Sequence, residues 1–97
     1  MPSAEATVTT ERPDRYIKQL VSHLGHRLTT ELADDGTGVI HRGEGRCVLT
    51  VQSGAMRLTA TATDAEELAA VQDVVTRHLL RFASQEDLDI TWTPLDP

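Results

Sequence analysis

The fold is decided between residues 46 and 62, where the chain reads RCVLTVQSGAMRLTATA. On both sides of Ser53-Gly54, apolar residues alternate with polar ones, which is the period of a strand with one face buried. Glycine tolerates the positive φ of a tight hairpin turn, so the stretch predicts two antiparallel strands. The residues expected on the apolar face are Cys47, Leu49, Val51, Met56, Leu58, Ala60 and Ala62.

Two further turn signals come before this hairpin, at Asp34-Asp35-Gly36 and Gly43-Glu44-Gly45. Together with Ser53-Gly54 they divide the middle of the chain into four short strands. Gly36, Gly38, Gly43 and Gly45 are interpreted as turn residues, because none of them leads into the start of a helix as a phosphate-binding loop does. Since the other face of the strands is polar, all helices are expected on one side of the sheet.

Two amphipathic helices are predicted on either side of these strands. The first covers Pro13 to Leu28, because proline suits the first helical turn and apolar residues then recur at helical spacing. The second begins near Asp64, where a glutamate three residues later gives the spacing of a capping box, and continues to about Ser84. Strands are also expected at Ala6 to Thr10 and at Leu88 to Trp92, with Trp92 facing the core.

These elements predict an α+β fold: a two-layer sandwich with an antiparallel sheet and two helices packed on one face, in the order β-α-β-β-β-β-α-β. The length of 97 residues suits a single domain spanning residues 1–97, with an ordered core over about residues 6–93. Exposed sheet edges leave open an unknown protein partner or a second copy of the chain.

Composition narrows the range of partners. Nine Lys and Arg against 15 Asp and Glu give a net charge of −6, which disfavours nucleic acid and anionic membrane surfaces. No stretch approaches the roughly 20 apolar residues of a spanning helix, so no membrane association is expected. The first 15 residues lack a positively charged start followed by an apolar run, and Cys47 is the single cysteine. The expected compartment is therefore the cytoplasm.

Four residues form a candidate metal site: His23, His26, His78 and Cys47. His23 and His26 are one turn apart at the edge of the first helix's apolar face, and His78 lies on the edge of the second helix that faces its neighbour. With the inward-facing thiol of Cys47 they would make a soft ligand set of the kind that zinc or iron accepts. The alternative interpretation is half-buried packing histidines and an inert core thiol, because neither a zincin spacing nor a CxxC pair is present.

Several segments resemble the bacterial domain-of-unknown-function family 2218. They are RYIKQL at 15–20, the HxxH pair at 23–26, GRCVL at 45–49, VVTRHLLRFA at 74–83 and the terminal strand ending at Trp92. The resemblance spans nearly the whole chain and departs from the family pattern at Ser84-Gln85-Glu86. It implies a small protein that in some relatives is fused to siderophore-interacting flavin reductases, and so a link to iron acquisition. It places the four candidate ligands on recurring polar positions of the family.

Three classes of function stay open. The leading expectation is a noncatalytic binding or accessory domain, and the alternative is a metal- or iron-handling accessory module that uses the histidine cluster. The third is a very small enzyme acting through a histidine as general acid or base, which requires a pocket around that histidine. Convergence of the three helical histidines on one point would favour the metal-handling module.

Overall fold

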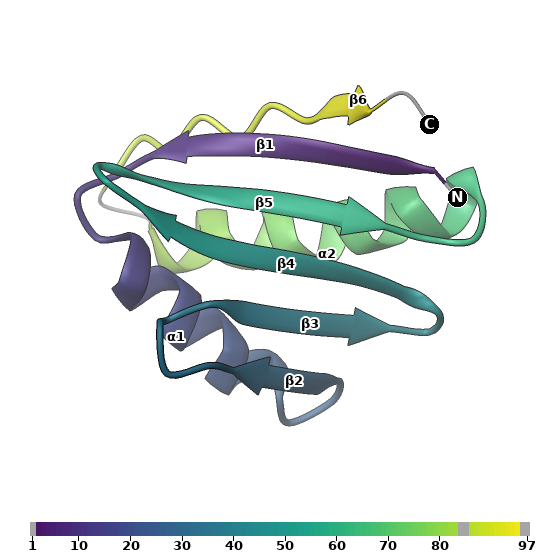
Figure 1. Cartoon of the computed structure of the whole chain (residues 1–97), viewed down its shortest axis with the longest axis horizontal. Coiled ribbons are helices and arrows are strands. Elements are labelled where there is room, and N and C mark those ends of the chain that lie inside the picture. The colour runs from purple at the N-terminus through teal and green to yellow at the C-terminus, as the bar shows by residue number, and fades with distance from the viewer. Residues whose placement is uncertain (1, 84–85, 96–97) are drawn as a thin grey trace.

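The computed structural model describes residues 2–83 and 86–95, which form a six-stranded sheet and two helices (Figure 1). The elements are β1 (Ser3–Thr9), α1 (Pro13–Leu24), β2 (Thr29–Leu32), β3 (Gly38–Arg42), β4 (Gly45–Gln52), β5 (Ala55–Thr61), α2 (Ala65–Phe82) and β6 (Thr93–Leu95). The sheet order is β2-β3-β4-β5-β1-β6, with every neighbouring pair antiparallel. The predicted α+β class and the order of its elements are confirmed.

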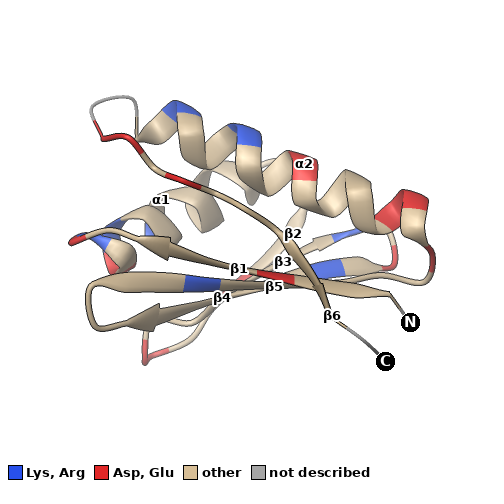
Figure 2. Ribbon diagram, turned by 90° about the horizontal axis from the view of Figure 1, so that it is seen from above, with Lys and Arg blue, Asp and Glu red and all other residues tan. Residues whose placement is uncertain are grey.

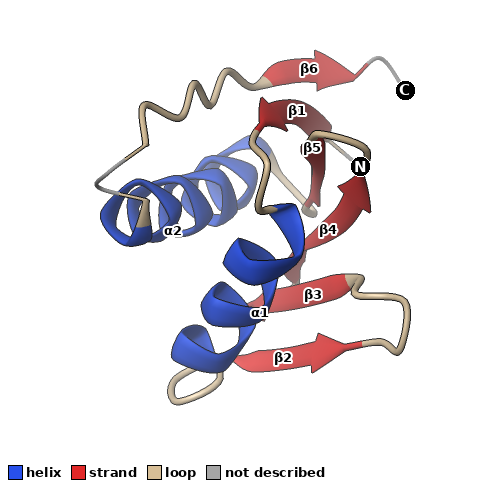
Figure 3. Ribbon diagram, turned by 90° about the vertical axis from the view of Figure 1, so that its left-hand side faces the viewer, coloured by secondary structure: helices blue, strands red, loops and turns tan. Residues whose placement is uncertain are grey.

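Both helices cover the same face of the sheet, and the other face is left open (Figures 2 and 3). Apolar and polar residues alternate along β4 and β5 as predicted, and the predicted apolar face is turned toward the helices. Cys47, Leu49, Met56 and Leu58 point into the core and are fully buried, whereas Arg57 points to the open face and is exposed. The core is the layer between the sheet and the two helices, as the one-sided pattern of the hairpin predicted.

Two glycines of the strands let the helices approach the sheet closely. A Cβ at Gly38 would lie 2.8 Å from methyl carbons of both Ile17 and Val21 on α1, and one at Gly45 would lie 2.6 Å from a methyl carbon of Val71 on α2. The interpretation of these two glycines as turn residues was wrong, because they are strand residues under a helix. Gly36, with a φ of 90°, is a turn residue as predicted.

Helix α1 ends at Leu24, before the predicted end at Leu28. Gly25 donates its backbone N–H to the Val21 carbonyl, and the chain then turns so that Thr29–Leu32 can pair with β3. A glycine weakens helix continuation, and the strand pairing fixes where the turn falls.

Helix α2 begins as predicted, with Asp64 as its N-cap. The Asp64 carboxylate accepts from the Glu67 backbone N–H at 2.8 Å, and Glu67 in turn accepts from the backbone N–H of Thr63 at 3.2 Å. The helix ends at Phe82, and the predicted end at Ser84 lies outside the described residues. In the described part of the chain, neither helix has the length and apolar character needed to cross a membrane.

The prediction of a strand over Leu88 to Trp92 was wrong. Alternate side chains of this segment do pack against the core, but its backbone joins no strand, and the pairing with β1 begins only at Thr93. Trp92 donates its indole N–H to the Thr76 hydroxyl on α2 at 2.8 Å. The segment passes from the end of α2 toward the edge of β1 (Figure 2). It is held by side-chain contact with the helix and not by backbone hydrogen bonds to a neighbouring strand. At the other end of the chain, β1 begins at Ser3, earlier than the predicted Ala6.

Candidate functional site

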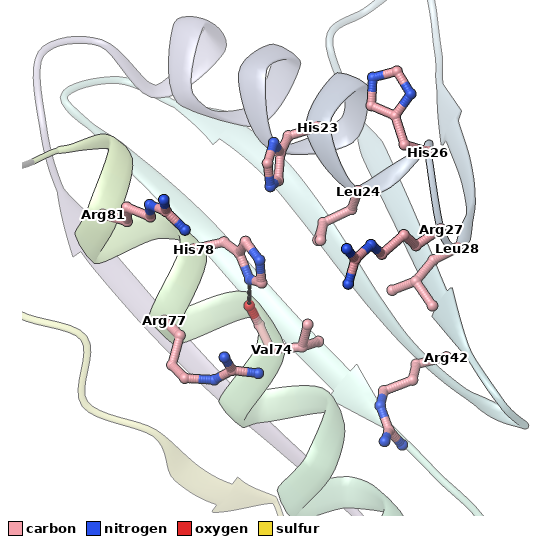
Figure 4. Close-up of a pocket in the computed structure, with 10 residues that line it drawn as sticks. All are labelled: His23, Leu24, His26, Arg27, Leu28, Arg42, Val74, Arg77, His78 and Arg81. Carbon is pink, nitrogen blue, oxygen red and sulfur yellow. Dashed lines mark hydrogen bonds between the residues drawn. The ribbon is translucent and has the colours of Figure 1, made fainter.

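A cavity of about 430 Å³ lies between the two helices, open at the surface, and we call it the interhelix cleft (Figure 4). Its walls come from the end of α1 with the following turn, from the last residue of β3 and from the second half of α2. Four arginines and three histidines line it together with three aliphatic side chains. The lining residues are His23, Leu24, His26, Arg27, Leu28, Arg42, Val74, Arg77, His78 and Arg81.

The local structure explains why these side chains share one cleft. On α2, Val74, Arg77, His78 and Arg81 follow one another at intervals of three, one and three residues, which is a single stripe along a helix. Arg42 follows Ile40 by two residues on β3 and therefore lies on the face of the sheet that the helices cover. The remaining lining residues belong to the last turn of α1 and to the turn that Gly25 begins.

The charge in the cleft is of one sign. No Asp or Glu is among its lining residues within the described ranges. Asp73 pairs with Arg77 at 2.8 Å from outside the cleft, and Arg42 lies close enough to Glu67 to help lower the pKa of that carboxyl, after hydrogen bonds from Thr63 and Glu44. Arg27 and Arg81 form no ion pair with any carboxylate that the structure describes. The cleft is thus a local concentration of positive charge in an acidic chain.

Acidic and basic residues also occupy different parts of α2. Acidic residues stand in its first turn, whereas Arg77 and Arg81 stand in its second half and line the cleft. Figure 2 shows red at the start of α2 and blue in its second half. Acidic groups near a helix N-terminus and basic groups near its C-terminus both interact favourably with the helix dipole. The dipole accounts for this order along the axis. It does not account for two arginines and His78 on the same flank of the helix.

His23 and His78 come together across the cleft as predicted for helices on one sheet face. Their ring centroids are 5.3 Å apart, and Phe82 stands edge-on to His23 at 5.1 Å. The Nδ1 atom of His78 lies 2.6 Å from the Val74 carbonyl oxygen. A carbonyl only accepts, so Nδ1 is the donor and the second ring nitrogen, Nε2, is left for another contact.

The other two candidate ligands do not join this pair. His26 follows the end of α1 and points away from His23 and His78 (Figure 4). Cys47 is fully buried in the sheet, and burial raises the pKa of its thiol to about 12. The residues that the structure describes contain no group of three or more His, Cys, Asp or Glu side chains gathered as metal ligands. The metal set remains a prediction, and its geometric basis is the pair of His23 and His78.

A second polar cluster, which we call the Glu86 clamp, lies at the other end of α1. The Glu86 carboxylate accepts hydrogen bonds from the Tyr16 hydroxyl and, at 2.9 Å, from the Thr10 hydroxyl. The bond from Tyr16 is the main cause that lowers the pKa of Glu86, and the same bond raises the pKa of Tyr16. The clamp ties the segment after α2 to the start of α1. Sequence reasoning missed it, since no local pattern links residues 16 and 86.

Fold and cleft together define a class of protein: a small α+β domain in which two helices on an open antiparallel sheet enclose a cationic cleft. The chain belongs to the bacterial family described as "Uncharacterized protein conserved in bacteria (DUF2218)", whose model matches residues 5–93. This confirms the family resemblance of the sequence.

A solved structure is similar over the whole length of both chains. It is the NMR structure of PA4090 from Pseudomonas aeruginosa, which is 33% identical, with a TM-score of 0.83 and full coverage of each chain. No curated protein matches the sequence. The comparisons therefore establish the family and the fold.

Proposed function

We propose that this protein is a noncatalytic binding domain that takes a small, multiply charged anion into the interhelix cleft. The observation that carries the proposal is the concentration of four arginines around one cavity in a chain of net charge −6. Guanidinium groups bind carboxylates and phosphates through paired, charge-assisted hydrogen bonds. The chain has nine Lys and Arg in all, so nearly half of its permanent positive charge surrounds this cavity.

The size of the cleft supports a small molecule as the ligand. Ligand sites commonly measure about 300–1,000 Å³, and the interhelix cleft lies within this range at about 430 Å³. A polynucleotide is disfavoured because the net charge of −6 would repel a long phosphate backbone outside the cleft.

The chemistry of the lining supports binding without catalysis. Within the described residues, the cleft is lined by no hydroxyl, thiol or carboxylate that would act as a nucleophile or orient a histidine base. The oriented histidine is His78, and its partner is the Val74 backbone carbonyl of its own helix. Arginines supply charge and directed N–H groups but no group that transfers protons near neutral pH.

Titration with pyrophosphate tests the proposal, because it is a small anion that carries several charges. Binding to the native protein would be measured by calorimetry, and its location by shifts of backbone amide NMR signals. The double variant Arg27→Gln/Arg81→Gln removes two guanidinium groups that form no described ion pair and should weaken binding at least about tenfold. The matched control, Arg15→Gln/Arg46→Gln, makes the same change in net charge away from the cleft and should leave affinity within about twofold. Equal affinity in the two double variants would show that the cleft is not the site.

A metal- or iron-handling role is the second candidate function. It is favoured by the ring centroids of His23 and His78, which lie 5.3 Å apart. The arginines argue against it, since four guanidinium groups raise the local potential that a cation would have to enter. Elemental analysis of the purified protein, with thermal shifts against zinc and iron, separates the two roles. A metal-induced shift that is lost in His23→Ala/His78→Ala and enlarged in Arg27→Gln/Arg81→Gln would favour the metal.

We propose the cytoplasm as the compartment. Cys47 is the one cysteine of the chain and is fully buried, so the fold relies on no internal disulfide. Proteins of reducing compartments typically lack disulfides, which supports this assignment.

A further inference from the structure

The interhelix cleft has an apolar part as well as a cationic part. Leu24 comes from α1, Leu28 from the turn after it and Val74 from α2, and all three line the cavity. Figure 4 shows Leu24 and Val74 between the end of the cleft that holds Arg81 and the end that holds Arg42. A strip of aliphatic side chains therefore separates Arg81 from Arg42, and Arg27 lies beside this strip.

This strip is incompletely covered by the protein itself. Leu28 and Val74 pack against the core but are only partly buried, whereas Leu24 is buried to 4% exposure. An inorganic anion would satisfy guanidinium groups and leave the aliphatic strip in water. A ligand with an apolar body would remove the exposed surface of Leu28 and Val74 from water, which favours binding in proportion to the area covered.

From this arrangement we infer that the ligand is an amphipathic organic anion: a phosphate or carboxylate head joined to an apolar body about the size of one aromatic ring. The inference rests on the proposed anion site, because the arginines hold the head. The body lies on Leu28 and Val74 and occupies the space that a head group alone leaves. Preference for an apolar body is then a property of the strip, separate from the affinity for charge.

A series of four probes separates the head from the body: inorganic phosphate, glycerol phosphate, phenyl phosphate and benzyl alcohol. Affinities are measured with the full chain by calorimetry or amide NMR shifts at one ionic strength. Phenyl phosphate should bind about tenfold more tightly than either inorganic phosphate or glycerol phosphate, and more tightly than benzyl alcohol.

One conservative variant tests the strip directly. Val74→Thr keeps the shape of the side chain and replaces a methyl group by a hydroxyl, so the affinity for phenyl phosphate should fall about threefold while that for phosphate stays unchanged. The matched control is Val48→Thr, at a half-buried valine on the open face of the sheet, and it should change neither affinity.

Each contrary outcome points to a different error. Equal binding of phosphate, glycerol phosphate and phenyl phosphate would overturn the amphipathic ligand and leave the anion site standing. Benzyl alcohol binding as tightly as phenyl phosphate would overturn it as well, because the arginines would then not hold a head group. If none of the three phosphates bound and pyrophosphate also failed, the proposed function itself would be wrong.

Discussion

Charged side chains have hydrogen-bond partners at the start of α1 but gather without such partners at its end. At its start, the Glu86 clamp gives one carboxylate two hydroxyl donors, from Tyr16 and Thr10. At its end, the interhelix cleft gathers arginines of which Arg27 and Arg81 have no described carboxylate partner. Groups that satisfy one another stabilise the fold, whereas like charges held together without partners do not. We therefore expect variants of the clamp to change stability and variants of the cleft to change binding.

The largest effect should come from lifting α1 off the sheet, because both ends of the helix depend on its position. Gly38→Ala adds a Cβ that would meet Ile17 and Val21 at 2.8 Å, and neither methyl group is the end of a long flexible chain. Overpacking of this kind costs about 1–3 kcal/mol. Chemical denaturation, followed by the fluorescence of the single Trp92, measures the loss. Ala55→Val adds bulk on the open face instead and should change stability by less than about 0.5 kcal/mol.

The next largest effect should come from the clamp alone. Tyr16→Phe removes the hydroxyl that donates to Glu86 but keeps the buried ring, so unfolding should become easier by about 1 kcal/mol. Pyrophosphate affinity should not change, since the clamp and the cleft lie at opposite ends of the helix. A variant with native stability and weakened binding would contradict the division of roles between the two ends.

The clamp also predicts how stability depends on pH. The hydrogen bonds of Glu86 hold its pKa below the ordinary value of 4.5, so its contribution is present above pH 4.5 and is lost as pH falls through the lower folded value. The pKa of Tyr16 is shifted in the opposite direction, because it is raised above the ordinary value of 10.0. The contribution of Tyr16 to stability is therefore present below pH 10.0 and is lost only as the pH rises through the higher folded value. The stability gap between the native protein and Glu86→Gln should therefore narrow on acidification below pH 4.5. If this stability gap did not change with pH, Glu86 would not have this role.

Much of the fold could be predicted because its signals are local. The alternation around Ser53-Gly54 predicts the pairing of β4 with β5 and which of their side chains face the core. The capping pattern at Asp64 predicts the start of α2. The errors have long-range causes. The end of α1 at Leu24 depends on the pairing of β2 with β3, and the absence of a ladder over 88–92 depends on the contact of Trp92 with α2.

The candidate site was predicted in part for the same reason. Placing both helices on one face predicts that His78 lies toward the first helix, and in the structure its ring lies 5.3 Å from that of His23, centroid to centroid. The arginines of α2 could be predicted to share a face with His78 from their spacing, because residues three or four positions apart lie on the same side of a helix. The role of Arg42 could not be predicted, because it depends on the tertiary packing that brings the end of β3 to the cavity between the two helices. For Cys47 the local pattern was sufficient. The alternation predicts that its side chain points inward, and this burial raises the pKa of the thiol.

The smallest effect, and the sharpest test of the comparison, is the stability of the cleft variant Arg27→Gln/Arg81→Gln. Both side chains are exposed and form no described ion pair, so their loss removes mutual repulsion and a weak favourable interaction with the helix ends. These two terms oppose each other, and the net change should stay within about 0.5 kcal/mol of the native protein in buffer without polyvalent anions. Urea denaturation in low and high sodium chloride measures it. Salt should stabilise the native protein more than the variant, because four arginines repel one another in the native cleft and only two remain in the variant. A loss above about 1 kcal/mol would mean that the arginines support the fold as Tyr16 does, and the contrast between the two ends of α1 would fail.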